Sequence, residues 1–217
     1  MILRGYDIEL IRLKHSDIEL VRKWRNAPDI NQHMEFRKFI TPEMQEKWFQ
    51  SVDTIYNNYF IISVKGNKIG LINGSEINWE KKETGNGGIF IWDTDYLKTI
   101  IPLRASLLLT DMSIILGMER TYIKVLKDNV AAVNYNISLG YELLPGQENN
   151  YNQQYVLTKE NYFSKTKKIR EVLLQKENSK IDVIVDDPEH EVSKFLLNIL
   201  TNLSEENKNK INLVIAA

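Results

Sequence analysis

Residues 125–143 read VLKDNVAAVNYNISLGYEL and change from a β-rich pattern to an apolar helical one within a few positions. The run 120–128 predicts a strand, and residues 129–140 predict a helix. Gly140 suits the end of that helix, because glycine adopts the left-handed conformation that often closes helices. The runs 141–146 and 153–163 predict two closing strands. Strand, helix and strand thus follow one another, with Asn129 at the first junction.

The residues before this stretch predict a sheet with helices around it. Apolar alternation and β-branched runs predict strands, of which the middle ones form an antiparallel meander. Capping residues and prolines at first-turn positions predict the helices. The predicted strands are 8–14, 59–66, 68–80 and 87–93, and the helices are 16–26, 42–52 and 102–117. The order β α α β β β α β α β β indicates a mixed α/β (α+β) domain over residues 1–163, with a largely antiparallel central sheet.

Residues 164–217 predict a C-terminal extension. An exposed helix with a linker precedes a short apolar strand at 181–185, an amphipathic helix at 187–203 and a strand at 211–216. A β-α-β unit of this size cannot bury its own apolar faces. We therefore expect it to dock on the main domain or on a second subunit of a homodimer.

Composition narrows the classes of function. The chain has 217 residues, a net charge of −1 and no cysteine. Disulfides, thiolate metal sites and a cysteine nucleophile are thereby excluded. The scattered Lys and Arg residues leave no footprint for nucleic acid. No run approaches the ~20 apolar residues of a membrane span, so we expect a soluble cytoplasmic protein without nucleic-acid or membrane partners.

Three segments carry a resemblance to a known family. VRKWRNAPDI at 21–30 is similar to the end of the first helix in amino-sugar acetyltransferases, and TPEMQEKWF at 41–49 is similar to their second helix. The stretch 125–143 resembles the segment where the coenzyme A arm meets the acceptor. Residues 8 to about 160 thus resemble the GNAT superfamily, in the branch with ribosomal-protein and nucleotide-amino-sugar N-acetyltransferases. The resemblance implies a GNAT-type acyl-CoA N-acyltransferase fold, acetyl-CoA as co-substrate and no metal.

The resemblance also implies where coenzyme A binds. A strand that separates from its neighbour leaves backbone groups that a pantetheine arm can pair with. Asn129 is expected to contact that arm, and the next helix start to bind the pyrophosphate. The family's glycine-rich loop is absent here, since residues 95–105 read DYLKTIIPLRA. The expected contacts are Ile89, Phe90, Ile91 and Trp92 for the arm, and Lys98, Thr99, Arg104 and Ala105 for the phosphates; a lost or altered grip is the alternative.

The resemblance does not assign the general acid that protonates the leaving thiolate, and it points to Asn136 and Tyr135 only as catalytic positions on the helix predicted at 129–140. In many relatives a tyrosine occupies the position of Asn136, whereas here Tyr135 lies one residue earlier and is expected on a different side of the helix. Attack without a strong acid is chemically possible, because a thiolate leaves readily near neutral pH.

The acceptor amine must lose a proton before it attacks. Glu76, on the third predicted strand, and His33, after the first helix, are the candidate bases; an exposed carboxylate and a solvated loop histidine are the alternatives. Trp24, Arg25 and Asn26 offer a flat face, a phosphate-binding fork and an amide to an acceptor. Trp24 fits equally as a core residue.

Three hypotheses for function remain open. The first is N-acetylation of a primary amine on a nucleotide-linked amino sugar used in surface glycan synthesis. The second is acetylation of a protein N-terminus or another small amine, and the third is a degenerate GNAT domain that only binds. A closed pocket with a basic and aromatic wall favours the sugar, whereas an open cleft favours a peptide.

The acids around Pro188 are interpreted as first-turn helix residues and not as a metal site.

Overall fold

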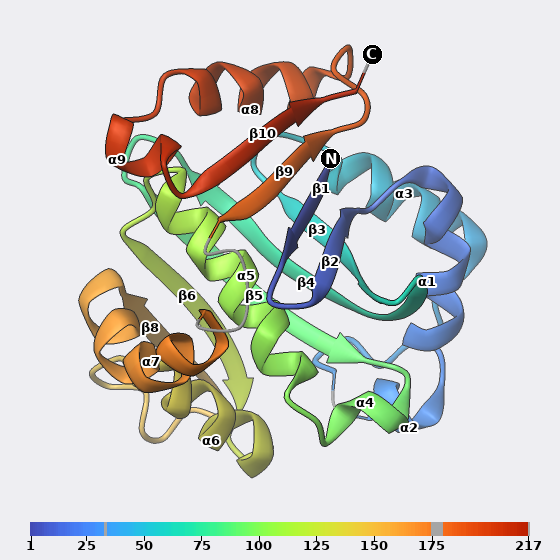
Figure 1. Cartoon of the computed structure of the whole chain (residues 1–217). Coiled ribbons are helices and arrows are strands. Elements are labelled where there is room, and N and C mark those ends of the chain that lie inside the picture. The colour runs from blue at the N-terminus through green and yellow to red at the C-terminus, as the bar shows by residue number, and fades with distance from the viewer. Residues whose placement is uncertain (33, 175–179, 217) are drawn as a thin grey trace.

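The computed structural model describes residues 1–32, 34–174 and 180–216. Ten strands form one sheet in the order β10-β9-β1-β2-β3-β4-β5-β6-β8-β7 (Figure 1). The pairs are antiparallel except β5 with β6 and β9 with β10. The strands are β1 Ile2–Gly5, β2 Ile8–Arg12, β3 Asn58–Val64, β4 Asn67–Asn78, β5 Glu83–Ile91, β6 Arg120–Leu126, β7 Glu142–Leu143, β8 Asn152–Thr158, β9 Ile181–Val185 and β10 Ile211–Ile215.

Helices cover both faces of this sheet, so the predicted mixed α/β architecture is confirmed. The helices are η1 His15–Asp17, α1 Ile18–Arg25, α2 Pro28–Asn31, α3 Pro42–Val52, α4 Thr94–Leu97, α5 Ile101–Ile115, α6 Val130–Leu139, α7 Lys159–Leu174, α8 Glu191–Thr201 and α9 Glu205–Lys208. Alternate residues of β3 point to opposite faces, as strand geometry requires. Phe60 and Ile62 join the large core with α5 and α8, whereas Ile61 joins a smaller core under α1 and α3.

One strand was not predicted, and another was predicted too long. The N-terminal strand β1 was not predicted; it pairs with β2 through a turn in which Tyr6 and Asp7 take positive φ angles of 55° and 58°. The last predicted strand, 153–163, ends at Thr158, where α7 begins. The Thr158 hydroxyl accepts a hydrogen bond from the Asn161 backbone at 3.2 Å, which is a helix-start contact. The proposed boundary at residue 163 therefore falls inside a helix.

The C-terminal β-α-β unit docks on the chain's own sheet. Strand β9 pairs antiparallel with β1, with Leu3 opposite Val183, and β10 extends the edge in parallel with β9 (Figure 1). Helix α8 covers the sheet face beside α5, and the centroid of its Phe195 ring lies 5.1 Å from that of Trp79, the residue after β4. The sequence left two docking sites open, the main domain and a second subunit, and in this structure the unit docks on the main domain.

A buried ionic cluster fixes α7 to the core. Asp111 of α5 accepts hydrogen bonds from Tyr6 at 2.5 Å and from Tyr162 at 2.9 Å, and it also forms an ion pair with Arg170. The Arg170 guanidinium lies over the Tyr162 and Phe163 rings, at 5.4 and 5.1 Å from their centroids. A buried carboxylate needs such partners, because its desolvation is otherwise costly.

Among the described residues, no helix is long and apolar enough to cross a bilayer.

We predict that the extension unfolds together with the main domain. Leu200 of α8 is 1% exposed within the core shared with α5, so Leu200→Ala should lower the free energy of unfolding by about 2–5 kcal/mol in one cooperative transition. Chemical denaturation followed by fluorescence and circular dichroism measures this. Val214→Ala on β10, where the side chain is 50% exposed, is the control and should change it by less than about 1 kcal/mol. Two separate transitions would contradict the shared core.

Candidate functional site

Strands β5 and β6 pair over only part of their length. Their register runs through Thr84 opposite Thr121 to Gly87 opposite Ile123, with a shift between Thr84 and Gly87, and no pair follows. Strand β5 remains paired with β4 as far as Ile91, and β6 with β8 as far as Leu126. Beyond Gly87 the two strands therefore diverge, and each turns an edge without a strand partner toward the other (Figure 1).

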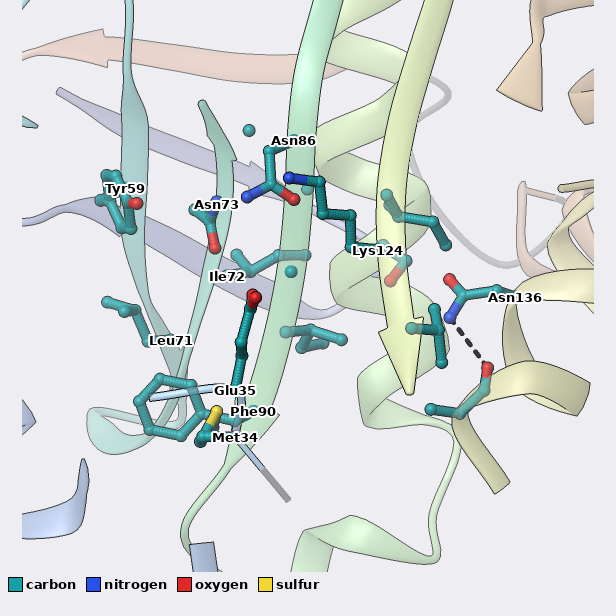
Figure 2. Close-up of a pocket in the computed structure, with 18 of the residues that line it drawn as sticks. Met34, Glu35, Tyr59, Leu71, Ile72, Asn73, Asn86, Phe90, Lys124 and Asn136 are labelled. Atoms are coloured by element: carbon teal, nitrogen blue, oxygen red, sulfur yellow. Dashed lines mark hydrogen bonds between the residues drawn. The ribbon is translucent and has the colours of Figure 1, made fainter. Parts of the chain in front are cut away.

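A cavity of about 670 Å³ occupies this gap and continues under the N-terminal helices. Its walls are the facing parts of β4, β5 and β6, one side of α5 and α6, and the segment after α2 (Figure 2). The lining positions are 21, 25, 34–36, 40, 44, 45, 48, 59, 71–74, 84, 86–90, 106, 109, 110, 113, 121, 123–126, 129, 132, 135, 136, 139, 141 and 152. The sheet opening and the space beside β4 thus form one continuous site.

Two adjacent glycines lie where the strands separate. A Cβ on Gly87 would approach the Ile123 side chain to 3.3 Å, and one on Gly88 would approach Asn73 Oδ1 to 3.1 Å. Both contacts are tight for a Cβ, so a side chain here would push against the sheet. Glycine keeps the backbone of β5 accessible from the gap.

The strand residues predicted to bind the arm divide into two groups. Ile89 and Phe90 line the cavity, whereas Ile91 and Trp92 are 5% exposed and do not. The Trp92 indole N–H donates to the Lys68 carbonyl at 2.8 Å, and its ring stacks on Trp24 at 6.2 Å. Trp92 is therefore a core residue on the α1 face, and Trp24 packs against that core, half-buried and outside the cavity lining.

Helix α6 brings three predicted residues to the cavity. Asn129 caps its start, accepting from the Ala132 N–H at 3.2 Å, and its side chain lines the site. Asn136 donates to the Ala132 carbonyl at 2.8 Å (Figure 2). The Tyr135 hydroxyl donates to the Pro102 carbonyl at 2.9 Å and lies 2.7 Å from Ser106 Oγ. Burial raises the pKa of Tyr135 to about 12. Asn136 and Tyr135 both line the site.

The residues predicted to hold the phosphates lie at the start of α5 and outside the cavity lining. Lys98, Thr99, Arg104 and Ala105 are all absent from the lining. Arg104 is turned toward the β1–β2 turn, where it binds the Asp7 carboxylate at 2.6 Å and the Tyr6 carbonyl at 3.0 Å. Ala105 is completely buried, and Thr99 Oγ1 accepts from the Ile101 N–H at 3.2 Å. Arg104 is thus paired with a carboxylate distant in sequence and does not point into the cavity.

The acceptor wall contains one of the three predicted helix residues. Arg25 lines the cavity, with Nη1 at 3.2 Å from Met34 Sδ and its guanidinium 5.8 Å from the Phe90 ring centroid. Its Nε is buried and has no hydrogen-bond partner among the described residues. Burial lowers the Arg25 pKa. Asn26 does not line the cavity; it exchanges hydrogen bonds with the Ile40 backbone at 2.8 and 2.9 Å. Its role is to hold the chain at Ile40.

Glu76, one of the two candidate bases, is not among the residues that line the cavity. Glu76 takes a left-handed φ of 56° opposite Gly85, and its side chain lies over that glycine, where an added Cβ would be 3.1 Å from Glu76 Oε2. Glu76 is exposed in this conformation and does not contribute to the cavity wall. His33 lies outside the described residues.

The cavity contains one carboxylate, Glu35, that was not predicted from the sequence. Glu35 extends from the segment after α2 toward Ile72 and Asn73 (Figure 2). Among the lining residues, which all belong to the described chain, it is the only carboxylate, and Arg25 and Lys124 are the only cations. The stretch around Glu35 has no hydrophobic period, and no sequence signal marked it.

Comparisons with known proteins agree with this architecture. Residues 10–156 match the family described as "Acetyltransferase (GNAT) domain", which is more than half of the chain. No curated protein matches the sequence. Among solved structures, FdhC, described as a nucleotide-linked sugar GNAT, aligns with a TM-score of 0.65 and 17% identity over 80% of this chain and 98% of its own.

Two further structures have the same fold. Spermidine N-acetyltransferase from Vibrio cholerae, solved with CoA and spermine, has a TM-score of 0.60 and 18% identity over 73% of this chain and 99% of its own. RimL, a ribosomal L7/L12 α-N-protein acetyltransferase solved with coenzyme A, has a TM-score of 0.63 and 16% identity over 73% and 98%. From the family match and the open sheet together, the chain belongs to the acetyltransferase (GNAT) domain family and is an N-acetyltransferase.

Proposed function

We propose that acetyl-CoA binds with its pantetheine arm between β5 and β6 and transfers its acetyl group to the amine of a nucleotide-linked amino sugar. The observation that carries the proposal is the loss of pairing after Gly87 and Ile123, which borders a cavity of about 670 Å³. An extended arm with amide groups fits there as an added strand, because it supplies the hydrogen bonds that the β5 edge lacks.

The phosphates of coenzyme A fit best at the start of α5. This helix has 15 residues, and its positive dipole end favours an anion. Its Ile101 and Arg104 N–H groups are already bonded to Thr99 and Ile100, and Pro102 has no N–H. Arg104 also pairs with Asp7, so this grip relies on the helix dipole and on the exposed Lys98. A weaker hold than that of a glycine-rich loop follows, because fewer amides converge on the phosphates.

The acceptor side of the cavity favours a nucleotide-linked sugar. Phe36, Trp48, Tyr59 and Phe90 supply aromatic surface, and Arg25 supplies an incompletely bonded guanidinium. Aromatic faces suit a base or sugar ring, and guanidinium suits a diphosphate. Residues 34–36 line this part of the cavity beside these aromatic side chains. The likeness of the fold to a nucleotide-linked sugar GNAT is in keeping with this proposal.

We predict that filling the gap weakens coenzyme A binding. Ala132 of α6 lines the cavity, so Ala132→Trp should place an indole where the arm binds and weaken the affinity at least about tenfold, or ~1.4 kcal/mol. Calorimetric titration with coenzyme A measures this. Ala131→Trp, exposed on the same helix, is the matched control and should bind like the wild type. A wild-type chain that binds no coenzyme A would leave only a degenerate GNAT domain.

We predict that the nucleotide matters for the acceptor. Release of free thiol from acetyl-CoA should be fastest with UDP- or TDP-linked amino sugars, and kcat/KM should fall at least about tenfold for the same sugar without its nucleotide, because its diphosphate no longer pairs with Arg25. Spermidine and N-terminal peptides are the competing acceptors. If either of these is preferred, the acceptor class is wrong while acetyl transfer itself stands.

A further inference from the structure

The cavity holds few groups that can accept a proton from an ammonium. Its ionisable side chains are Glu35, Arg25, Lys124 and the tyrosines 59, 135 and 141. Burial raises the pKa of all three tyrosines, so they stay protonated at neutral pH. Arginine and lysine are cations and have no free lone pair there. Within the described chain, Glu35 is the one lining residue with the chemistry of a base.

The Glu35 side chain reaches the part of the site where transfer takes place. Its carboxylate lies toward Ile72 and Asn73 of β4, with Phe90 of β5 beside it (Figure 2). Phe90 belongs to the part of β5 that lacks a partner on the β6 side. An amine held by Glu35 is thus next to the strand along which the thioester is proposed to bind.

The backbone on both sides of Glu35 is held in place. The Met34 N–H donates to the Asn31 carbonyl at 3.0 Å, and the Met34 carbonyl accepts from Arg37 Nε at 2.9 Å. At the other end, Asn26 binds the Ile40 backbone in both directions, and Arg22 Nη1 donates to the Ile40 carbonyl at 3.3 Å. The contacts at Ile40 tie the end of this segment to α1, and those at Met34 hold the backbone beside Glu35. The Glu35 side chain itself is exposed and lines the cavity.

We propose that Glu35 binds the acceptor ammonium and removes its proton; this rests on the proposed acetyl transfer. The ammonium gives one proton to the Glu35 carboxylate, and the nitrogen lone pair then attacks the thioester carbonyl. The C–N bond forms and the C–S bond breaks. The thiolate leaves with its electron pair and takes up the second proton of the nitrogen, so that one amide, one thiol and one proton, released from Glu35 to solvent, result.

The test compares Glu35→Gln with the wild type at the fastest amine of the acceptor panel. We expect kcat/KM at neutral pH to fall about 100-fold or more, as for loss of a general base. The deficit should narrow as the pH rises, because free amine then forms without the enzyme. Affinity for coenzyme A, measured by calorimetry, should not change, and Glu35→Asp should restore part of the activity. Glu80→Gln, an exposed carboxylate outside the cavity, is the matched control.

Several outcomes would overturn the assignment. Glu35→Gln with wild-type kcat/KM would remove it, as would an equal deficit at every pH, since a purely structural role does not depend on free amine. A loss in Glu76→Gln without one in Glu35→Gln would return the base to β4. If a polyamine or peptide is the fastest acceptor, only the sugar proposal fails and the comparison proceeds with that amine. A wild-type chain that binds acetyl-CoA and transfers to no amine overturns both proposals.

Discussion

The separation of β5 from β6 after Gly87 and Ile123 is the constraint on which the rest of the site depends. Backbone groups that face a gap lose the hydrogen bonds of a continuous sheet, and such groups are costly unless water or a ligand supplies partners. The cost is tolerated because each strand is paired along its other side, β5 with β4 and β6 with β8. The gap is therefore held open by the fold before any substrate arrives, which lowers the ordering cost of binding.

Local pattern was enough to predict most elements of this fold. The meander β3-β4-β5, the apolar helix α5 and the glycine-terminated helix α6 all follow from period and punctuation. Strand β1 was missed because its four residues are too short to show an alternation, and its turn uses non-glycine residues at positive φ. The start of α7 was missed because its first turn, Lys159 to Tyr162, continues the polar and aromatic mixture of β8.

The site was less predictable, because its contacts join residues distant in sequence. Ile89, Phe90 and Asn129 were placed by the strand and helix that carry them, and these reach the cavity. Arg104 does not, since its partner Asp7 lies 97 residues away. Asn26 binds backbone 14 residues away instead of a ligand. No one-dimensional pattern contains such partners, and for the same reason the place of Glu35 on the cavity wall became visible only in three dimensions.

The C-terminal strands β9 and β10 and the gap between β5 and β6 lie on opposite sides of strands β1 to β4 in the sheet. Strands β9 and β10 extend the β1 edge, and α8 joins α5 over the large core, where Asn207 also donates to the Ile115 carbonyl at the end of α5 at 3.2 Å. Helix α5 is thus fixed at its C-terminal end by the extension and at Asp111 by α7, while its earlier turns border the cavity through Ser106 and Leu109. One helix carries both functions, because burying one of its faces leaves the other free to form a wall of the site. The extension consequently stabilises the wall against which the strands diverge without occupying the space between them.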